Sequence, residues 1–258
     1  MVFNKKLRME NILKIAAQKG MRKPDVSQRT ISDMKPVFKN QDVPKSDSVY
    51  YTVYRNLEIV GGKIRYDITV IPQKIVGEEF TKTFGHYHAK ANPELYEVLD
   101  GRAAFLLQKY KTDPSEISEA YIIEASAGDK VVMPPGFGHL SVNIGKEDLA
   151  LANWIGTGAY DYDLMKNFHG GCYYVLLARQ SPGDGGAGAD IKFEKNPNYR
   201  AVPELKKLKP KDAPGLGIKN GKDDPVLDLK NEPKKLEWLS NYEKYANLLT
   251  IENLYQEI

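Results

Sequence analysis

The chain has 258 residues, of which 41% are hydrophobic, and its 37 basic and 34 acidic side chains give a net charge of +3. This length and apolar content suit one sizeable core with additions at each end, and the near balance of charge excludes the broad basic field of nucleic-acid or anionic-membrane binders. Cys172 is the single cysteine, so an internal disulfide is excluded. No apolar run has the length of a membrane span or the character of a signal peptide, so we expect a soluble, cytoplasmic protein.

The N-terminal part of the chain predicts little regular structure. Residues 9–19 carry a partial helical stripe of apolar side chains that ends at Gly20, which predicts a short helix within an N-terminal extension of residues 1–25. Residues 20–48 are polar and contain three prolines, so we expect them to run irregularly toward the first strand.

Strand patterning begins at residue 49. Residues 63–71 alternate between apolar and polar side chains, which is typical of a strand with two different faces. Strands are predicted at residues 49–54, 63–71, 94–99, 103–110, 120–124, 130–133, 140–143, 149–155, 173–178 and 191–194. Many short strands without intervening helical patterns indicate an antiparallel sandwich or barrel, and we predict an all-β jelly-roll barrel over residues 26–199.

The C-terminal part differs in composition and predicts an extension over residues 200–258. Residues 181–188 are glycine-rich and are expected to form a flexible loop before it. Residues 200–234 are dominated by Lys, Pro, Asp and Gly, so we expect them to be extended or mobile. Between residues 236 and 249 apolar side chains recur at helical spacing, which predicts a terminal amphipathic helix that docks through Trp238.

Two segments of the barrel carry three of the four histidines of the chain. His86 and His88 are two apart, so on a strand both side chains point to the same side. Glu94 follows after five residues, and His139 comes just beyond a Pro-Pro-Gly turn. Three imidazoles and one carboxylate suit a borderline divalent ion such as iron, zinc, manganese or nickel. His169 is outside both segments and is expected to be an ordinary loop residue.

The spacing of these ligands resembles the two cupin motifs, with Phe80 in place of a glycine that often precedes the first histidine by six residues. Several short sequence motifs resemble, more narrowly, the cupin-type glucose-6-phosphate isomerases of archaea and some bacteria. These motifs are GHYHAK at 85–90, ELY at 94–96, LLQ at 106–108, PP at 134–135, VNIG at 142–145, DY at 161–162, RTISDM at 29–34 and NP at 196–197. The resemblance covers residues 26–199.

This resemblance implies an aldose–ketose isomerase that interconverts glucose 6-phosphate and fructose 6-phosphate, with one divalent metal ion (Fe, Mn, Ni or Zn) per subunit bound by His86, His88, Glu94 and His139. Moving the carbonyl between C1 and C2 develops negative charge on two sugar oxygens, which a metal ion stabilises as a Lewis acid. Glu94 is the candidate for moving a proton between the carbons. A metal-assisted hydride shift would need no base, and both routes stay open.

The resemblance also implies a set of substrate and catalytic residues. Phosphate contacts are expected from Thr69, Thr83 and Gly85, sugar contacts from Tyr51 and Tyr96, and catalytic roles for Glu94, Tyr96 and Tyr162. Beside these, Tyr160 is a candidate substrate-binding residue, and Lys90 either helps to bind the anionic substrate or extends into water. Tyr160 stands where the family commonly has a histidine, and a tyrosine of ordinary pKa is a poor base at neutral pH. Trp154 stands where a phosphate-contacting tyrosine is expected, so the phosphate contacts or the accepted sugar are expected to differ, with mannose 6-phosphate as one candidate.

Two other functions stay open at this point. The Tyr160 substitution favours a metal-containing sugar-phosphate sensor or binding protein without turnover. A cupin dioxygenase would use the same ligand set on iron, but the phosphate-site matches disfavour it. No nucleic-acid or membrane partner is expected. Because cupins generally associate through their sheet faces, we expect a homodimer.

Overall fold

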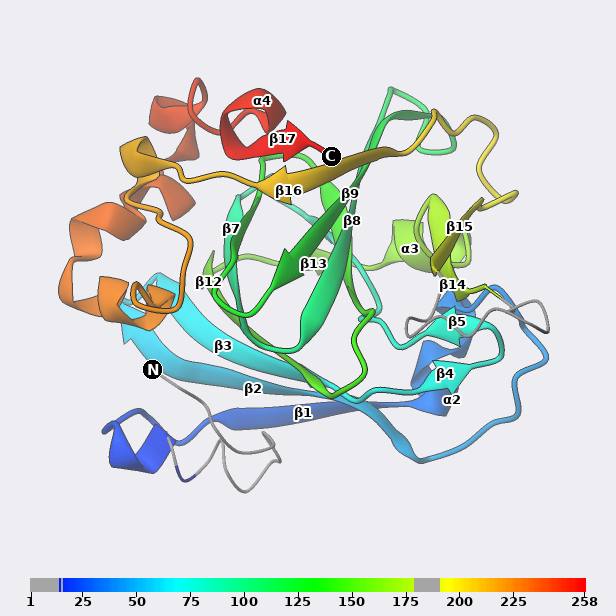
Figure 1. The fold of residues 1–258 in the computed structure, drawn as a ribbon, viewed down its shortest axis with the longest axis horizontal. Helices are drawn as coiled ribbons and strands as arrows, with labels where there is room; N and C mark the ends of the chain where they lie inside the picture. The colour runs from blue at the N-terminus through cyan, green and yellow to red at the C-terminus, as the bar shows by residue number, and fades with distance from the viewer. Residues whose placement is uncertain (1–13, 15, 179–190) are drawn as a thin grey trace.

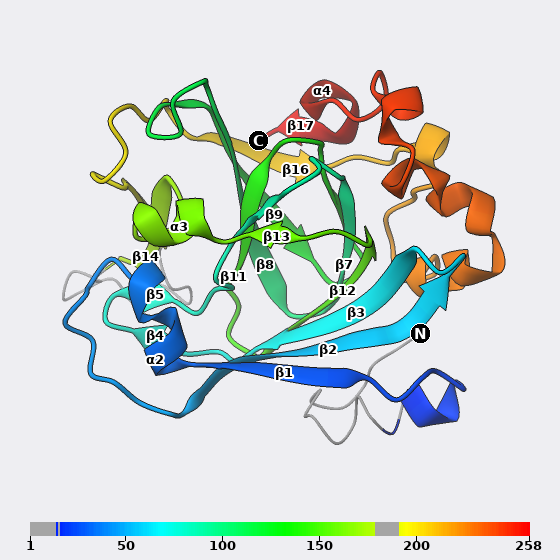
Figure 2. The same cartoon turned by 180° about the vertical axis from the view of Figure 1, so that it is seen from behind.

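Two large β-sheets face each other and form the centre of the molecule (Figures 1 and 2). The computed structural model describes residues 14, 16–178 and 191–258. One sheet has the strand order β1-β2-β3-β12-β7-β10, and the other has the order β11-β8-β9-β16-β17. A four-stranded sheet, β15-β14-β5-β4, lies beside them at the right of Figure 1, and β13 pairs with β6.

The elements follow one another along the described chain with few helices. The strands are β1 (Asp25–Thr30), β2 (Val49–Val60), β3 (Ile64–Ile71), β4 (Ile75–Val76), β5 (Glu79–Phe80), β6 (Tyr87–His88), β7 (Glu94–Asp100), β8 (Arg102–Tyr110), β9 (Ile117–Ser126), β10 (Lys130–Met133), β11 (Gly138–Asn143), β12 (Leu149–Gly156), β13 (Tyr160–Asp161), β14 (Tyr173–Leu177), β15 (Ile191–Lys195), β16 (Lys206–Pro210) and β17 (Tyr255–Glu257). The α-helices are α2 (Ile31–Met34), α3 (Asp163–Asn167) and α4 (Ile251–Leu254), and the 3-10 helices are η1 (Lys35–Val37), η2 (Pro214–Leu216), η3 (Val226–Asn231), η4 (Pro233–Leu239) and η5 (Tyr242–Tyr245).

The predicted all-β jelly-roll barrel is confirmed, and each predicted strand is present. Between residues 20 and 48, however, the prediction of irregular chain is wrong in part. Strand β1 pairs antiparallel with β2 at the edge of the six-stranded sheet. Its side chains are mostly exposed, with Val26 at 48%, so the strand carries little of the apolar alternation that reveals buried strands.

The alternation along β3 separates an internal cavity from an outer layer. Asp67 and Thr69 line the cavity on one side of the strand. On the other side, the ring of Tyr66 packs 5.0 Å from the ring of Trp154 on β12. The polar side of β3 therefore faces inward, and its apolar side is buried beneath a further layer of the chain.

The C-terminal extension forms this outer layer over β7 and β12. Trp154 Nε1 donates a hydrogen bond to the carbonyl oxygen of Val226 at 2.7 Å, and the Val226 amide donates to Glu97 Oε2 at 2.8 Å. Lys130 is buried, with its Nζ bonded to the Gly221 carbonyl and 3.7 Å from Glu97 Oε1. One residue of the extension is thus held by both strands, and a buried ion pair lies beside it.

The extension also adds strands to the barrel. β16 pairs parallel with β9 and antiparallel with β17, so both extend the five-stranded sheet (Figure 1). The expectation that residues 200–234 are extended or mobile is wrong in part, because they contain β16, η2, η3 and the start of η4.

The predicted amphipathic helix over residues 236–249 is wrong as one α-helix. The 3-10 helices η4 and η5 cover most of this range, and α4 is the single α-helical turn that follows them. Asn241, with φ −124° and ψ 43°, lies outside the helical region and interrupts the backbone pattern. The apolar spacing did identify side chains that dock, and four of them are buried: Leu236, Trp238, Leu239 and Leu249.

Part of the predicted N-terminal helix falls within the described chain. Residues 16–18 are helical, Ala16 is buried, and Gly20 adopts φ +63° in the turn that follows. The rest of the predicted helix up to residue 13, together with residue 15 and the predicted loop at 181–188, lies outside the described residues. Within the described ranges, no helix has the length and apolar character that crossing a membrane requires.

We expect Trp154→Phe to lower the free energy of unfolding by about 1–3 kcal/mol, because the Val226 carbonyl would be buried without its donor. Urea unfolding followed by circular dichroism measures this change. Tyr110→Phe, which keeps an aromatic ring at a side chain that is 37% exposed, is the control and should change stability by less than about 0.5 kcal/mol. Equal effects of the two substitutions would contradict the assigned role of Trp154.

Candidate metal centre and substrate cavity

The two histidine-bearing segments are joined by backbone hydrogen bonds. The His86 amide donates to the His139 carbonyl at 3.1 Å, and the His139 amide donates back to the His86 carbonyl at 3.0 Å. Gly85, just before them, adopts φ +80°, and a Cβ there would lie 3.2 Å from the His139 carbonyl oxygen. A residue without a side chain is therefore needed where this segment turns against β11.

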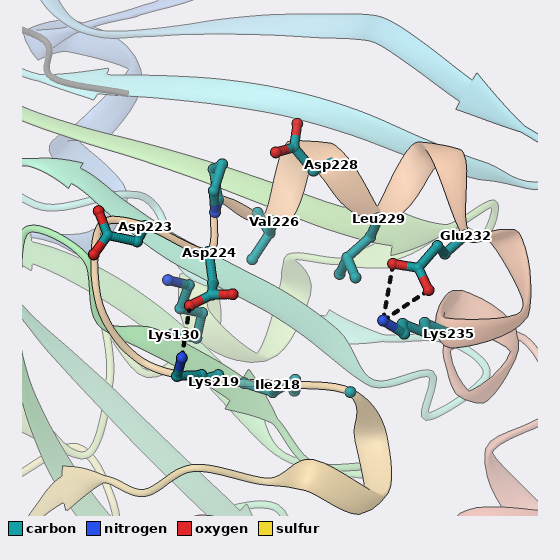
Figure 3. A pocket seen from close by; sticks show the side chains of 12 residues that line it. Lys130, Ile218, Lys219, Asp223, Asp224, Val226, Asp228, Leu229, Glu232 and Lys235 are labelled. Carbon is teal, nitrogen blue, oxygen red and sulfur yellow. Dashed lines mark hydrogen bonds and ion pairs between the residues drawn. The ribbon is translucent and has the colours of Figure 1, made fainter.

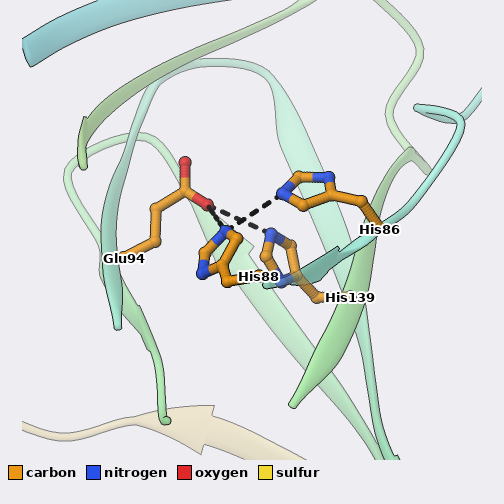
Figure 4. Close-up of side chains that lie close together, drawn as sticks. All are labelled: His86, His88, Glu94 and His139. Atoms are coloured by element: carbon orange, nitrogen blue, oxygen red, sulfur yellow. Dashed lines mark hydrogen bonds and ion pairs between the residues drawn. The ribbon is translucent and has the colours of Figure 1, made fainter. Parts of the chain in front are cut away.

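The three histidines and Glu94 converge on one point inside the barrel (Figure 4). Their candidate ligand atoms all lie within 4.8 Å of one another. Glu94 Oε2 is 3.3 Å from His88 Nε2 and 3.2 Å from His139 Nε2, and His86 Nε2 is 3.1 Å from His88 Nε2. The sequence prediction of this group as one site agrees with the geometry.

The donors at this point fit a divalent cation. Glu94 Oε2 and both ring nitrogens of His139 are buried and have no hydrogen-bond partner in the described part of the chain. Buried polar atoms without partners are rare and costly, and a metal ion would satisfy Glu94 Oε2 and one ring nitrogen of His139. Three imidazole nitrogens and a carboxylate oxygen are a ligand set that iron, manganese, nickel and zinc accept.

The protonation states also suit a cation. Burial and the neighbouring imidazoles hold the pKa of His86 well below its usual value, and burial lowers the pKa of His139. Burial opposes ionisation of Glu94, but the imidazoles of His139 and His88 outweigh it and hold the carboxyl pKa far below its usual range. For His88, burial is outweighed by Glu94, which raises the imidazole pKa. An ionised carboxylate beside two neutral imidazoles is ready to bind metal.

Two polar groups orient the ligands from behind. His88 Nδ1 is hydrogen-bonded to the Asn92 carbonyl oxygen, which assigns the proton to Nδ1 and leaves Nε2 free to bind a cation. Asn153 Nδ2 donates to Glu94 Oε1 at 2.7 Å, which fixes the carboxylate and leaves Oε2 pointing toward the imidazoles. Asn153 was missed in the sequence, because only the pairing of β12 with β7 brings it to Glu94.

A cavity opens beside this cluster, and most of the predicted substrate residues line it. The predicted residues among its lining are Tyr51, Thr69, Thr83, Gly85, Tyr96, Tyr160 and Tyr162. Lys90 is exposed and is not brought to the cavity, and its carbonyl accepts a hydrogen bond from Tyr242 at 3.1 Å. The roles of these residues stay predictions.

The two departures from the family pattern lie in different places. Tyr160 faces the cavity, with its ring centroid 4.3 Å from that of His86. Burial raises the Tyr160 pKa, so its hydroxyl is protonated at neutral pH. Trp154 points to the opposite side of β12 and is fully buried against the C-terminal extension.

Three charged residues near the cavity were not predicted as site residues. Arg55 and Asp67 line the cavity, and Arg65 contacts Asp67 and Tyr160. The alternation of β3 was a usable signal, because Arg65 and Asp67 share a strand face with Thr69.

A second pocket lies between the extension and the barrel, and each of its three lysines is paired with an acidic side chain (Figure 3). Lys219 Nζ is 3.3 Å from Asp224 Oδ2, and Lys235 Nζ is 2.8 Å from Glu232 Oε2. These pairs leave none of the pocket's lysines free to bind an anion, and we assign no site there.

We expect Asn153→Ala to weaken divalent-metal binding by about 10–100-fold, because the carboxylate of Glu94 would lose the donor that orients it. Titration calorimetry on chelator-stripped protein measures the affinity. Asn198→Ala, at an exposed asparagine outside the cluster, is the control and should leave it unchanged. Wild-type affinity in Asn153→Ala would show that Glu94 is oriented without it.

Sequence comparisons identify the family. A family model described as "Glucose-6-phosphate isomerase (GPI)" matches residues 28–183. A glucose-6-phosphate isomerase of Thermococcus gammatolerans is 34% identical over 145 residues, covering 54% of this chain and 74% of the relative. Another, from Thermococcus onnurineus, is 29% identical over 180 residues, covering 67% of this chain and 87% of the relative.

Among solved structures, the oxalate decarboxylase of Lactobacillus farciminis in its formate complex is 21% identical with a TM-score of 0.33, covering 43% of this chain and 30% of that chain. That score is too low to carry an argument about fold or chemistry. The family match spans more than half of the chain and contains every residue of the candidate metal centre and its cavity. This chain therefore belongs to the glucose-6-phosphate isomerase family.

Proposed function

We infer that this chain is a metal-dependent aldose–ketose isomerase that interconverts glucose 6-phosphate and fructose 6-phosphate. The observation that carries this conclusion is the group of three histidines and Glu94, with buried and unpartnered ligand atoms, at the side of a cavity lined by hydroxyl groups. Family membership supplies the substrate class.

The resident ion would be held by His86, His88, Glu94 and His139. When bound, a divalent cation supplies Lewis-acid stabilisation to the negative charge that develops on the two sugar oxygens. We propose iron, manganese, nickel or zinc, because each accepts this mixture of nitrogen and oxygen ligands.

We propose that proton movement and orientation at C1 and C2 depend on Glu94 and the surrounding tyrosines. Asn153 holds the Glu94 carboxylate beside the cavity, where Glu94 is the candidate to take up a proton from the sugar carbon. Because burial is outweighed by the imidazoles, which lower its pKa, Glu94 is a weak base, and a hydride shift that needs no base is the alternative route. Burial raises the pKa of Tyr96 well above its usual value, so its hydroxyl acts as a hydrogen-bond donor. Tyr162, which lies between Phe84 and Tyr160, is positioned to contact the sugar.

The phosphate is proposed to bind at the other end of the cavity. Thr69, Thr83 and Gly85 line the cavity and are the proposed phosphate contacts, and Tyr51 lines it as well. Hydroxyl and amide donors satisfy phosphate oxygens without a fixed cation. The glycine also allows a ligand to approach the backbone closely.

Location and assembly follow from the proposed reaction and fold class. We propose a cytoplasmic enzyme, since sugar phosphates are made and consumed inside cells. We propose a homodimer, in which the exposed faces of the sheets associate. Gel filtration with light scattering measures the assembly directly.

The first test is turnover of fructose 6-phosphate, coupled to glucose-6-phosphate oxidation, on chelator-stripped protein supplied with each of the four metals. We expect activity only after metal is restored, and we expect His139→Ala to lose at least about 100-fold, because one of four ligands is gone. His169→Asn is the matched control. His169 lies outside the cluster at φ +54°, a conformation that asparagine tolerates.

Two outcomes separate the alternatives. Metal-restored turnover in the wild type and in His169→Asn, but not in His139→Ala, supports the isomerase. Tight binding of metal and sugar phosphate without turnover under any metal would contradict it and favour a binding or sensor protein.

The phosphate end has its own test in Thr69→Val, which keeps the β-branched shape and removes the hydroxyl. We expect KM for fructose 6-phosphate to rise about tenfold, since a hydrogen bond to a charged group is lost. Thr52→Val, a buried threonine outside the cavity lining, should leave KM unchanged. An unchanged KM in Thr69→Val would remove this residue from the phosphate site.

A further inference from the structure

The cavity is also lined by a cationic side chain, Arg55. Arg55 lines the cavity together with Asp67 and Tyr160, and Arg65 lies against both of these residues. Asp67 is only 1% exposed, whereas the Arg55 side chain is 30% exposed. The Asp67 carboxylate is thus almost fully buried, whereas the Arg55 guanidinium is within reach of a ligand.

Asp67 is already satisfied by partners other than Arg55. Its Oδ2 accepts from Arg65 Nε at 2.9 Å, and its Oδ1 accepts from the Asn56 amide at 2.9 Å. Arg55 Nη1 reaches Oδ2 only at 3.5 Å, the single ion pair that Arg55 makes within the described chain. Two guanidinium charges therefore face one carboxylate, and the charge of Arg55 is left largely uncompensated.

A β-bulge sets the position of Arg55. The pairing of β2 with β3 shifts register between Tyr54 and Glu58, and Asn56 adopts φ +61° within the bulge. Asparagine tolerates this left-handed conformation better than most residues, and the hydrogen bond from its amide to Asp67 holds it there. Arg55 lies at the start of this bulge and, two residues from Val53 and four from Tyr51, shares their cavity-facing side of β2.

Arg55 lies next to the metal centre. Its Cζ is 5.8 Å from the ring centroid of Tyr160, which in turn lies 4.3 Å from the ring centroid of His86. Thr69, at the proposed phosphate end, is two residues from Asp67 on the same strand face, about 7 Å along the strand. Arg55 lines the same cavity as Thr69, His86 and Glu94, so a ligand that fills this cavity is within reach of its guanidinium.

We propose that Arg55 binds the negative charge that develops on the C1 and C2 oxygens of the sugar, and so selects ligands whose C1 end is anionic. The inference rests on the proposed isomerase function and adds a substrate-binding residue to it. An arginine stays charged at every relevant pH, and a donor fixed before the reaction stabilises developing charge without reorganisation. The bulge, with Asn56 held by Asp67, provides this fixed position.

The test compares two probes that differ only at C1, gluconate 6-phosphate with a carboxylate and glucitol 6-phosphate with a hydroxymethyl group. Titration calorimetry on the metal-loaded full chain measures both affinities. Arg55→Gln should weaken gluconate 6-phosphate binding by about 10–100-fold, the loss of one charge-assisted hydrogen bond, and glucitol 6-phosphate binding by less than about threefold. Arg55→Lys should recover part of the lost affinity, because it restores the charge without the planar fork.

Arg102→Gln is the matched control, because Arg102 is exposed and pairs with Glu124 at 2.6 Å outside the cavity lining. It should leave both affinities unchanged. In turnover, Arg55→Gln should lower kcat while KM changes by less than about threefold, since the charge appears mainly in the transition state.

Equal weakening of both probes by Arg55→Gln would overturn the proposal and assign Arg55 a role in cavity structure through Asp67. Unchanged binding of gluconate 6-phosphate would overturn it as well. The binding measurement needs no turnover, so it tests the role of Arg55 independently of the isomerase activity. A wild type that prefers gluconate 6-phosphate through Arg55 but does not isomerise would refute the isomerase and support the charge-binding role.

Discussion

The register between β7 and β12 is the constraint on which both the site and the outer layer depend. In this pairing Ile155 is opposite Glu94, and Asn153 is opposite Tyr96. Because successive side chains point to opposite faces, these strands send Glu94, Tyr96 and Asn153 into the cavity. Their outward residues include Glu97 and Trp154, which hold Val226 of the extension. A slip of one residue would exchange the two sets and destroy both at once.

Among the buried carboxylates of the described residues, Glu94 differs from the others in having no lysine or arginine partner. Among the described residues four carboxylates are buried: Asp67, Glu79, Glu94 and Glu97. Asp67 is paired with Arg65, Glu79 with Lys82, and Glu97 lies 3.7 Å from Lys130. Glu94 has imidazoles in place of a fixed lysine or arginine partner. A buried charge needs a compensating partner, and for Glu94 a bound metal ion would be that partner.

The sequence reveals the parts of this site that are local. His86 and His88 share a strand face by simple alternation, and the strands themselves carry clear apolar patterns. Asn153 was hidden, because only strand pairing brings it to Glu94. Arg55 continues the alternation of Tyr51 and Val53 but lies just beyond the predicted strand at residues 49–54. The edge strand β1 has mostly exposed side chains, so its sequence lacks the apolar alternation that marks a buried strand. In the extension, apolar spacing marked which side chains are buried but not whether the backbone is α-helical or 3-10.

Trp154 was expected to alter the phosphate contacts, but the structure places its side chain outside the cavity. Its indole N–H is committed to the Val226 carbonyl, and its ring packs on Tyr66 away from the cavity. Replacing a tyrosine by tryptophan there alters the outer layer and need not remove a hydroxyl from the cavity. The extension, which follows the matched family region, docks through this side chain. With β7 and β12 then covered on both faces, their side chains are mostly apolar on either side, and among the polar ones Glu97 and Asn153 have hydrogen-bond partners while Glu94 keeps one oxygen for a cation.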